Sequence, residues 1–216
     1  MIVMEVVDPP QRRRTGRPLS FDREAALEQA MLSFWRHGYE TTSIADLTEA
    51  MGITAPSIYA AFGNKRRLFF EAMHRYAGDP AEIENRLAAA PTARDAAHAM
   101  LVTAAITFTG EATPRGCLLA SATASGSEAS ADVRSAVSEV RRGIATRLVD
   151  RIDRDVAAGI LPTSTNAAAL SDLILAVAQG MSVLARDDVP RVRLLALAEQ
   201  AMLAWPDQRS PRIPPA

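Results

Sequence analysis

Cysteine is almost absent from this chain, since Cys117 is the single cysteine in 216 residues. One copy therefore cannot form an internal disulfide, which is typical of a protein that works in a reducing compartment. Aromatic residues are also scarce, at 5% of the chain, whereas alanine is abundant. Because aromatic side chains favour strands and alanine favours helices, this balance predicts a helical protein. The location that we expect is the cytoplasm.

Long apolar runs are missing as well. No uninterrupted apolar stretch approaches the roughly 20 residues that a membrane-spanning helix needs. The basic residues Arg12–Arg14 follow the first apolar residues, whereas in a signal peptide they would precede them. We therefore expect neither a membrane partner nor a secretion signal. The formal net charge is −1, so any DNA-binding surface must depend on a local excess of positive charge.

The groupings of side chains that carry catalysis are missing too. His37, His74 and His98 fall in different segments, without the spacing of metal ligands. The sequence shows no paired nucleophile and base and no glycine-rich phosphate loop. We therefore expect no enzyme activity, no metal and no other cofactor. A helical enzyme is the alternative from another functional class, and catalytic turnover without DNA affinity would support it.

Hydrophobic periodicity divides the chain into helices separated by glycine, proline and small polar residues. No segment alternates like a strand, and no internal repeat is evident. The pattern predicts an all-α protein with about nine helices, at 22–38, 42–52, 54–62, 64–77 and 92–108, one within 110–127, and at 128–158, 165–184 and 190–205. The charged residues of 150–155 are expected to form a solvated face of the longest helix.

The same pattern predicts four regions. Residues 1–20, with three prolines and four arginines, are expected to form a disordered basic arm. Residues 21–77, which include a helix, a glycine-bearing turn and a second short helix at 41–65, are expected to form a three-helix, helix-turn-helix DNA-binding domain, and residues 80–205 a larger helical domain. Residues 206–216 contain four prolines and are expected to be a disordered tail.

Residues 41–65 carry the strongest functional signal. A helix with Ile44 and Leu47 on one face leads into the turn 51–54, and a second short helix follows, which is the helix-turn-helix arrangement. Gly52 suits the positive φ that so tight a turn needs. The second helix can then present its outer face to the major groove. That face is small and mostly polar, and we expect it to contact DNA through Thr54, Ala55, Ser57 and Tyr59.

Phosphate-binding groups surround this unit. Lys65 is predicted at the start of the next helix, where its ammonium and the helix N-terminus both attract an anion. Thr42, the expected N-cap, and Ser43 open the first helix of the pair in the same way. Between residues 11 and 77, ten Lys/Arg against seven Asp/Glu leave a local excess of +3. Arg14 and Arg17 precede the first helix and are expected to reach a groove or phosphates.

The segment 16–76 resembles the DNA-binding domain of the TetR/AcrR family of transcriptional regulators. The residues that carry the likeness are Phe34, Gly38, Tyr39, Thr42–Ile44, Met51–Ile53, Pro56–Tyr59, Phe62, Lys65 and Leu68. Residues 114–118 and 179–187 resemble one branch of that family. The family follows this domain with a variable helical domain for ligand binding and dimerisation, which agrees with the helices predicted in 80–205.

One position departs from the family pattern. Many members have a larger polar side chain where this chain has Ala55. Direct hydrogen-bonded reading of a base from that position is therefore lost. Specificity is expected to depend more on Thr54, Ser57, methyl contacts and the shape of the DNA.

The resemblance implies a small effector molecule that binds inside the larger domain. Small, mostly apolar walls imply an apolar or weakly polar effector. The expected lining residues are Met100, Ala104, Phe108, Cys117, Val137, Arg141 and Val177. Cys117 is expected to be an inert core thiol. A sensor role would need an exposed thiolate with basic neighbours, for which Arg115 is the candidate.

The resemblance also implies a homodimer, formed through the last two long helices. The residues expected at the dimer interface are Leu170, Ile174, Gly180, Leu184, Leu194 and Met202. The dimer would set the spacing of two recognition helices on a palindromic double-stranded DNA operator, and the effector would disturb that spacing. The predicted function is a ligand-responsive repressor. An activator, or a ligand-independent DNA-binding protein of the same fold, is the alternative.

Overall fold

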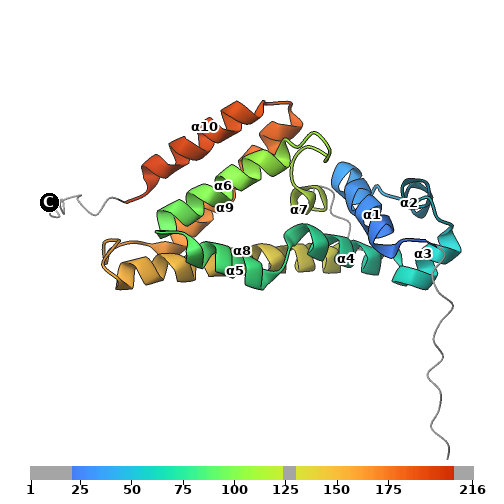
Figure 1. The fold of residues 1–216 in the computed structure, drawn as a ribbon, viewed down its shortest axis with the longest axis horizontal. Coiled ribbons are helices and arrows are strands. Elements are labelled where there is room, and N and C mark those ends of the chain that lie inside the picture. The colour runs from blue at the N-terminus through green and yellow to red at the C-terminus, as the bar shows by residue number, and fades with distance from the viewer. Residues whose placement is uncertain (1–20, 124–129, 207–216) are drawn as a thin grey trace, which may run out of the picture.

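The computed structural model describes residues 21–123 and 130–206, and these residues form helices without a single strand. Nine of the described helices have eight residues or more, and α7 is a single turn. In Figure 1, α1–α3 lie at one end of the molecule, and α6, α9 and α10 lie at the other. The helices α4, α5 and α8 run along one side between these ends. The all-α fold predicted from the sequence is confirmed.

The helices of the N-terminal end are α1 (Arg23–His37), α2 (Ile44–Met51), α3 (Ala55–Phe62) and α4 (Lys65–Ala77). The rest of the described chain forms α5 (Pro80–Ala89), α6 (Ala93–Phe108), α7 (Leu118–Ser121), α8 (Ala131–Ala157), α9 (Ala167–Arg186) and α10 (Arg191–Ala201), followed by the 3-10 turn η2 (Met202–Ala204).

Helix boundaries follow local capping chemistry. The side chains of Asp22, Thr54, Asn64 and Thr92 accept hydrogen bonds from the first backbone N–H groups of α1, α3, α4 and α6. Asn166 caps α9 in the same way. These short-range bonds depend only on neighbouring residues, so sequence reasoning could find them.

Two predictions about the helices were wrong. The N-cap of α2 is Ser43 instead of Thr42, because Ser43 and Asp46 form a reciprocal capping box. Thr42 is buried, and its hydroxyl donates to the carbonyl of Gly38 at 2.6 Å. Helix α5 was not predicted at all. It begins at Pro80, whose missing N–H is harmless in a first turn, and Asp79 caps it.

The N-terminal end is held together by aromatic and aliphatic residues from all four of its helices. Phe34 of α1 packs edge-on against Phe69 of α4, with ring centroids 5.3 Å apart. Leu47 of α2 and Ile58 of α3 are wholly buried in the same cluster. Burying aliphatic side chains of this size stabilises a fold by roughly 1.5–3 kcal/mol each, which keeps the short helices α2 and α3 in place.

A buried ion pair corrects the expected solvated face of α8. Arg151 and Asp155 are 7% and 3% exposed and form a salt bridge one turn apart. The Arg151 Nε donates to the carbonyl of Leu87 at 3.0 Å, and Asp155 accepts from the backbone N–H of Ala93 at 2.6 Å. The pair therefore fastens α8 to the end of α5 and to the start of α6.

Helix α9 is long and strongly apolar. By length and composition alone it could cross a membrane, with a mean hydropathy of 1.7 over an 18-residue window. The core helix of a soluble protein passes the same test, and α9 packs against α6, α8 and α10. Only 28% of the window is buried within the chain, so α9 leaves an apolar face exposed.

Candidate functional site

The turn between α2 and α3 has the backbone geometry of a helix-turn-helix. Gly52 ends α2 in the left-handed conformation, with φ 64° and ψ 26°, and its N–H donates to the carbonyl of Glu49. Thr54 then caps α3. Met51 and Ile58 are buried on the inner side of the two helices. Their packing leaves the opposite side of α3 directed away from the core.

The outward side of α3 carries the predicted DNA-contacting residues. Tyr59 is 49% exposed, which is unusual for a large aromatic side chain. Thr54 is exposed and its hydroxyl lies 2.9 Å from that of Ser57. Ala55 and Ser57 are partly exposed on the first turn. The structure therefore brings these four residues together on one accessible surface, next to the first turn of the helix.

Lys65 is held in place at the start of α4. Its ammonium donates to the backbone carbonyl of Glu40 at 3.3 Å and lies 4.6 Å from the centre of the Tyr39 ring. Partial burial lowers the pKa of Lys65, while the nearby charges of Glu40 and Asp46 oppose that shift. The side chain is thus a positioned cation beside the N-terminus of α4, where an anion is favoured.

The remaining predicted DNA contacts have different outcomes. Ser43 is exposed, but Thr42 is fully buried with its hydroxyl occupied, so Thr42 is not available to a phosphate. This corrects its predicted role. The backbone N–H and the hydroxyl of Ser43 both donate to Asp46, and these bonds hold the pKa of that carboxyl below its usual value. Arg14 and Arg17 lie outside the described residues.

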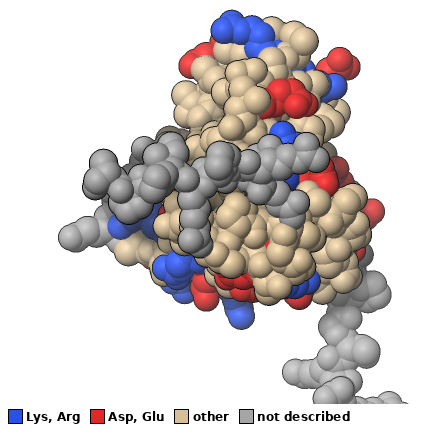
Figure 2. All heavy atoms as spheres, turned by 90° about the vertical axis from the view of Figure 1, so that its left-hand side faces the viewer, with Lys and Arg blue, Asp and Glu red and all other residues tan. Residues whose placement is uncertain are grey.

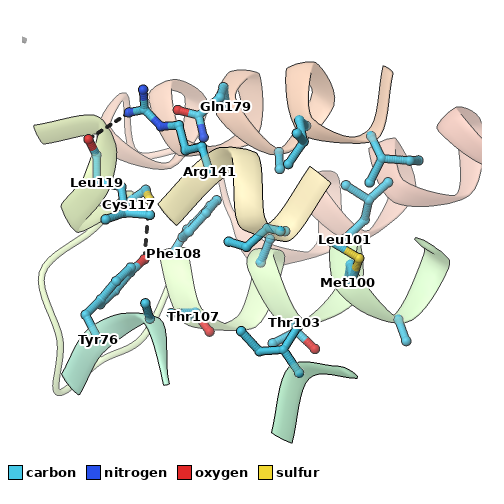
Figure 3. Close-up of a pocket in the computed structure, with 18 of the residues that line it drawn as sticks. Tyr76, Met100, Leu101, Thr103, Thr107, Phe108, Cys117, Leu119, Arg141 and Gln179 are labelled. Carbon is cyan, nitrogen blue, oxygen red and sulfur yellow. Dashed lines mark hydrogen bonds between the residues drawn. The ribbon is translucent and has the colours of Figure 1, made fainter. Parts of the chain in front are cut away.

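A second candidate site is an apolar pocket of about 570 Å³, lined by α1 and by α4 to α9 (Figure 3). Five of the seven predicted lining residues belong to it, namely Met100, Ala104, Phe108, Cys117 and Arg141. Val137 and Val177 are not among its lining residues. Val137 is wholly buried in the core, and Val177 is partly buried against that core. The volume lies within the range of about 300–1,000 Å³ that is common for ligand sites.

Polar groups gather at one end of this pocket. The Tyr76 hydroxyl donates to the sulfur of Cys117 at 3.4 Å, and burial raises the pKa of Tyr76 well above its usual value. Arg141 donates to the carbonyl of Leu119 at 2.7 Å. Figure 3 shows these residues, with Gln179, on the side of the pocket opposite Met100 and Leu101.

Sequence reasoning did not include Tyr76 or Gln179 among the lining residues. Tyr76 lies within the helix predicted at 64–77, and the need of a buried tyrosine for a hydroxyl partner is the signal that could have identified it. Cys117 is 5% exposed, and Arg115 forms an ion pair with Asp188. The burial of the thiol agrees with the expected core role.

The residues predicted at the dimer interface divide into two groups. Ile174, Leu194 and Met202 are at most 2% exposed within one chain, so they cannot lie on a contact surface and their assignment was wrong. Leu170 is partly exposed, whereas Gly180 and Leu184 are exposed. Three strongly exposed apolar residues on the same two helices and the following turn were not predicted, namely Val183, Val192 and Leu203.

The end of the molecule away from α2 and α3 shows no patch of one charge sign among its visible, described residues. Figure 2 views the molecule from the left-hand side of Figure 1, away from α2 and α3. Basic and acidic residues are interspersed there around a broad uncharged area. A DNA-binding surface needs a local positive excess, so this face offers none among its visible, described residues.

Comparison with known proteins gives matches along nearly the whole chain. The family model described as bacterial regulatory proteins, tetR family, matches residues 26–72, and that of the tetracyclin repressor-like C-terminal domain matches residues 91–201. The chain is 34% identical to the HTH-type transcriptional repressor ComR of Escherichia coli (strain K12), over 91% of this chain and 94% of ComR. It is 40% identical to the repressor BdcR of the same organism over 76 residues, which are 35% of this chain and 39% of BdcR.

Solved structures show the same likeness. The TetR family transcriptional regulator CifR, as a cysteine mutant in complex with 26-bp double-strand operator DNA, superposes with a TM-score of 0.83 at 43% identity. The alignment covers 88% of this chain and 100% of that one. A TetR regulator from Rhodococcus sp. RHA1 gives a TM-score of 0.60 at 36% identity, over 86% of this chain and 100% of that one.

Proposed function

The chain belongs to the TetR family of bacterial regulatory proteins, and from this we propose that it is a ligand-responsive repressor that binds a palindromic operator as a homodimer. The observation that carries the proposal is the helix-turn-helix, in which Gly52 and the buried Met51 and Ile58 leave the outer face of α3 exposed. CifR, which is 43% identical, has been solved with its operator DNA.

The DNA contacts that we propose divide into two kinds. Thr54, Ala55 and Ser57 face the bases, where small side chains allow close approach and methyl contacts. Tyr59, Ser43 and Lys65 hold phosphates, together with Arg14 and Arg17 of the N-terminal arm. Phosphate contacts position the protein without reading sequence, so the spacing of two recognition helices in a dimer contributes much of the selectivity.

The dimer is proposed through the exposed faces of α9 and α10. Val183 is 58% exposed and Val192 is 70% exposed, although both are apolar. Exposed apolar faces on two adjacent helices commonly form the interface between helical subunits. Leu170, Gly180 and Leu184 belong to the same proposed surface.

Release from DNA is proposed to begin in the pocket, where a small, largely apolar effector binds. Helix α4 connects the two sites, because Lys65 begins it and Tyr76 near its end lines the pocket. An effector that fits only one position of α4 changes the separation of the two recognition helices. A coupling of about 1–3 kcal/mol would weaken DNA binding roughly 5- to 150-fold.

An activator, or a DNA-binding protein without an effector, would share the same fold and DNA-contacting face. ComR and BdcR are both described as repressors, which favours repression here. We propose that the protein acts in the cytoplasm, as a regulator and not as an enzyme.

The test is binding of the purified full-length chain to a labelled duplex from the region upstream of its own gene, followed by electrophoretic mobility shift. We expect a specific complex with two subunits per site, and a reporter driven by that region should rise when the gene is deleted. Loss of reporter expression on deletion would identify an activator. Absence of a specific complex would contradict DNA binding at this region.

A further inference from the structure

We propose that the effector is an amphipathic anion, with an apolar body and a single carboxylate that pairs with Arg141. The proposal rests on the pocket being the effector site and narrows the chemistry of its ligand. Arg141 projects from α8, is half-buried, and lines the pocket. One guanidinium nitrogen donates to the carbonyl of Leu119 at 2.7 Å and to the hydroxyl of Thr123 at 3.2 Å.

The charge of Arg141 has no protein counterion within the described chain. None of the salt bridges of the described residues includes it, and its two acceptors are neutral oxygens. Its Nε is buried and lacks a hydrogen-bond partner among the described residues. A cation removed from water is costly unless an anion or further acceptors compensate it. A ligand carboxylate supplies both the charge and the acceptor, in the planar geometry that suits a guanidinium.

The rest of the lining makes the pocket electropositive. Its other charged residues are Arg75 and Arg86, and no Asp or Glu is found among the described residues that line it. Arg75 is already paired with Glu24 and Glu28 outside the pocket, at 2.8 and 3.5 Å. Arg86 is exposed on α5, so its charge remains in water. Arg141 is therefore the half-buried cation to which a buried anion would bind, and a cationic ligand would meet repulsion without compensation.

The polar groups are placed for an amphipathic molecule. Arg141, Gln179, Tyr76 and Cys117 lie toward one side of the pocket, and Met100 and Leu101 lie on the opposite side, where the labelled polar residue is the neutral Thr103 (Figure 3). A carboxylate beside Arg141 and Gln179 would leave the apolar body against the methyl and thioether groups. The same position lies beside Leu119 at the start of α7, which packs against α1 and α4, so the bound anion would act on the helices that carry the DNA-binding unit.

The experiment measures binding of matched probes to the full-length protein by isothermal titration calorimetry. Decanoate, decanol and decyltrimethylammonium share an apolar chain and differ in charge. We expect wild type to bind decanoate at least 10-fold more tightly than decanol, and the ammonium most weakly. Phenylbutanoate, an aromatic carboxylate, distinguishes an aliphatic body from an aromatic one.

The decisive variant is Arg141→Gln, which keeps hydrogen-bond donors and removes the charge. It should weaken decanoate binding about 10- to 100-fold and leave decanol binding within about twofold. Arg142→Gln, at the exposed neighbouring position on α8 outside the pocket, is the control and should bind both probes like wild type. If the variant fails to fold, as judged by thermal melting, Arg141→Lys must retain a preference for decanoate over decanol.

Other results would overturn the proposal. Equal binding of decanol and decanoate to wild type, an equal loss of both in Arg141→Gln, or no binding of either carboxylate each excludes an anionic effector paired with Arg141. Operator binding by the ligand-free protein is measured beside these titrations. If decanol but not decanoate releases the operator, the pocket is the effector site and the carboxylate assignment fails. If the chain binds no operator, the proposed function fails independently of the probe affinities.

Discussion

Trp35 and Gly116 join the DNA-binding end of the chain to its larger helical part. The indole Nε1 of Trp35, on α1, donates to the backbone carbonyl of Gly116 at 2.8 Å, and both groups are buried. The backbone carbonyl of Trp35 in turn accepts from the hydroxyl of Ser121 at 3.0 Å and from Arg186 at 3.2 Å. Because Trp35 also lines the pocket, a ligand there contacts the residue on which this junction depends.

The first prediction concerns the close approach of Gly38 to α7 at this junction. Gly38 has φ 86° and ψ 169°, and a Cβ there would lie 2.8 Å from the backbone carbonyl oxygen of Ser121. Gly78 has nearly the same backbone conformation, with φ 77° and ψ 179°, but open space around it. Gly38→Ala should therefore lower the free energy of unfolding more than Gly78→Ala.

Both substitutions place alanine in a backbone region that favours glycine, which costs about 1–3 kcal/mol. Only Gly38→Ala adds a clash with the carbonyl oxygen of Ser121. Urea unfolding of both variants measures the difference. Equal destabilisation would show that α1 and α7 are not in tight contact in solution.

The second prediction separates charge from hydrogen bonding at the DNA interface. Lys65→Ala should weaken all operator sequences about equally and reduce the slope of log affinity against log salt by about one. Tyr59→Phe should weaken binding by about 0.5–1.5 kcal/mol without changing that slope, because a phenol releases no counterion. Fluorescence anisotropy at several salt concentrations measures both. Arg94→Ala, exposed on α6, is the charge-matched control. Unchanged affinity in either test variant would refute its phosphate contact.

The third prediction is a pH dependence that arises from the capping box of α2. The bonds from Ser43 lower the pKa of Asp46 in the folded state. A lowered carboxyl pKa stabilises the fold above the unfolded value of about 3.9, and this stabilisation is lost as pH falls through the folded value. Asp46→Asn should remove that part of the acid-induced loss of stability.

Thermal unfolding of wild type and variants between neutral and acidic pH measures this effect. Ser43→Ala removes the hydroxyl bond to Asp46 but keeps the backbone N–H bond, so it should flatten the same part of the profile to a smaller extent. An acid profile that neither variant changes would exclude this linkage.

The fourth prediction tests the buried pair on α8. Asp155→Asn leaves the Arg151 guanidinium buried without its counterion and weakens the bond to Ala93 at the start of α6. Removing one partner of a buried pair costs about 3–5 kcal/mol. Asp153→Asn, on the exposed face two residues earlier, should change the free energy of unfolding little. Chemical denaturation compares them, and similar values for both variants would place Asp155 in solvent.

The fifth prediction concerns the proposed dimer. Val183→Glu places a charge in the exposed apolar face of α9 and should weaken subunit association by about 3 kcal/mol or more, over 100-fold. Thr146→Glu, at an exposed position of α8, should leave the oligomeric state unchanged. Sedimentation velocity gives the mass of each variant. A dimer that persists in Val183→Glu would move the interface elsewhere.

Much of the fold could be predicted because its signals are local. Asp22, Thr54 and Asn64 cap helices through bonds to residues at most three positions away, and Gly52 marks the turn by its own backbone conformation. The spacing of apolar residues identified the helix-turn-helix for the same reason. Thr42 and Ser43 show the limit of such reasoning. Either hydroxyl could cap α2, and the packing of Thr42 against Gly38 decides between them.

By itself, the sequence determined the helical class and the helix-turn-helix, since each depends on chain neighbours. Only the tertiary structure decided which side of each later helix is covered. Ile174 and Leu194 are as apolar as Val183, yet they face inward and Val183 faces outward. Arg151 and Arg141 lie on the same helix, but Arg151 has a buried carboxylate partner, whereas Arg141 lines a pocket and has no such partner among the described residues. These differences arise from contacts between distant segments, which periodicity within one helix does not encode.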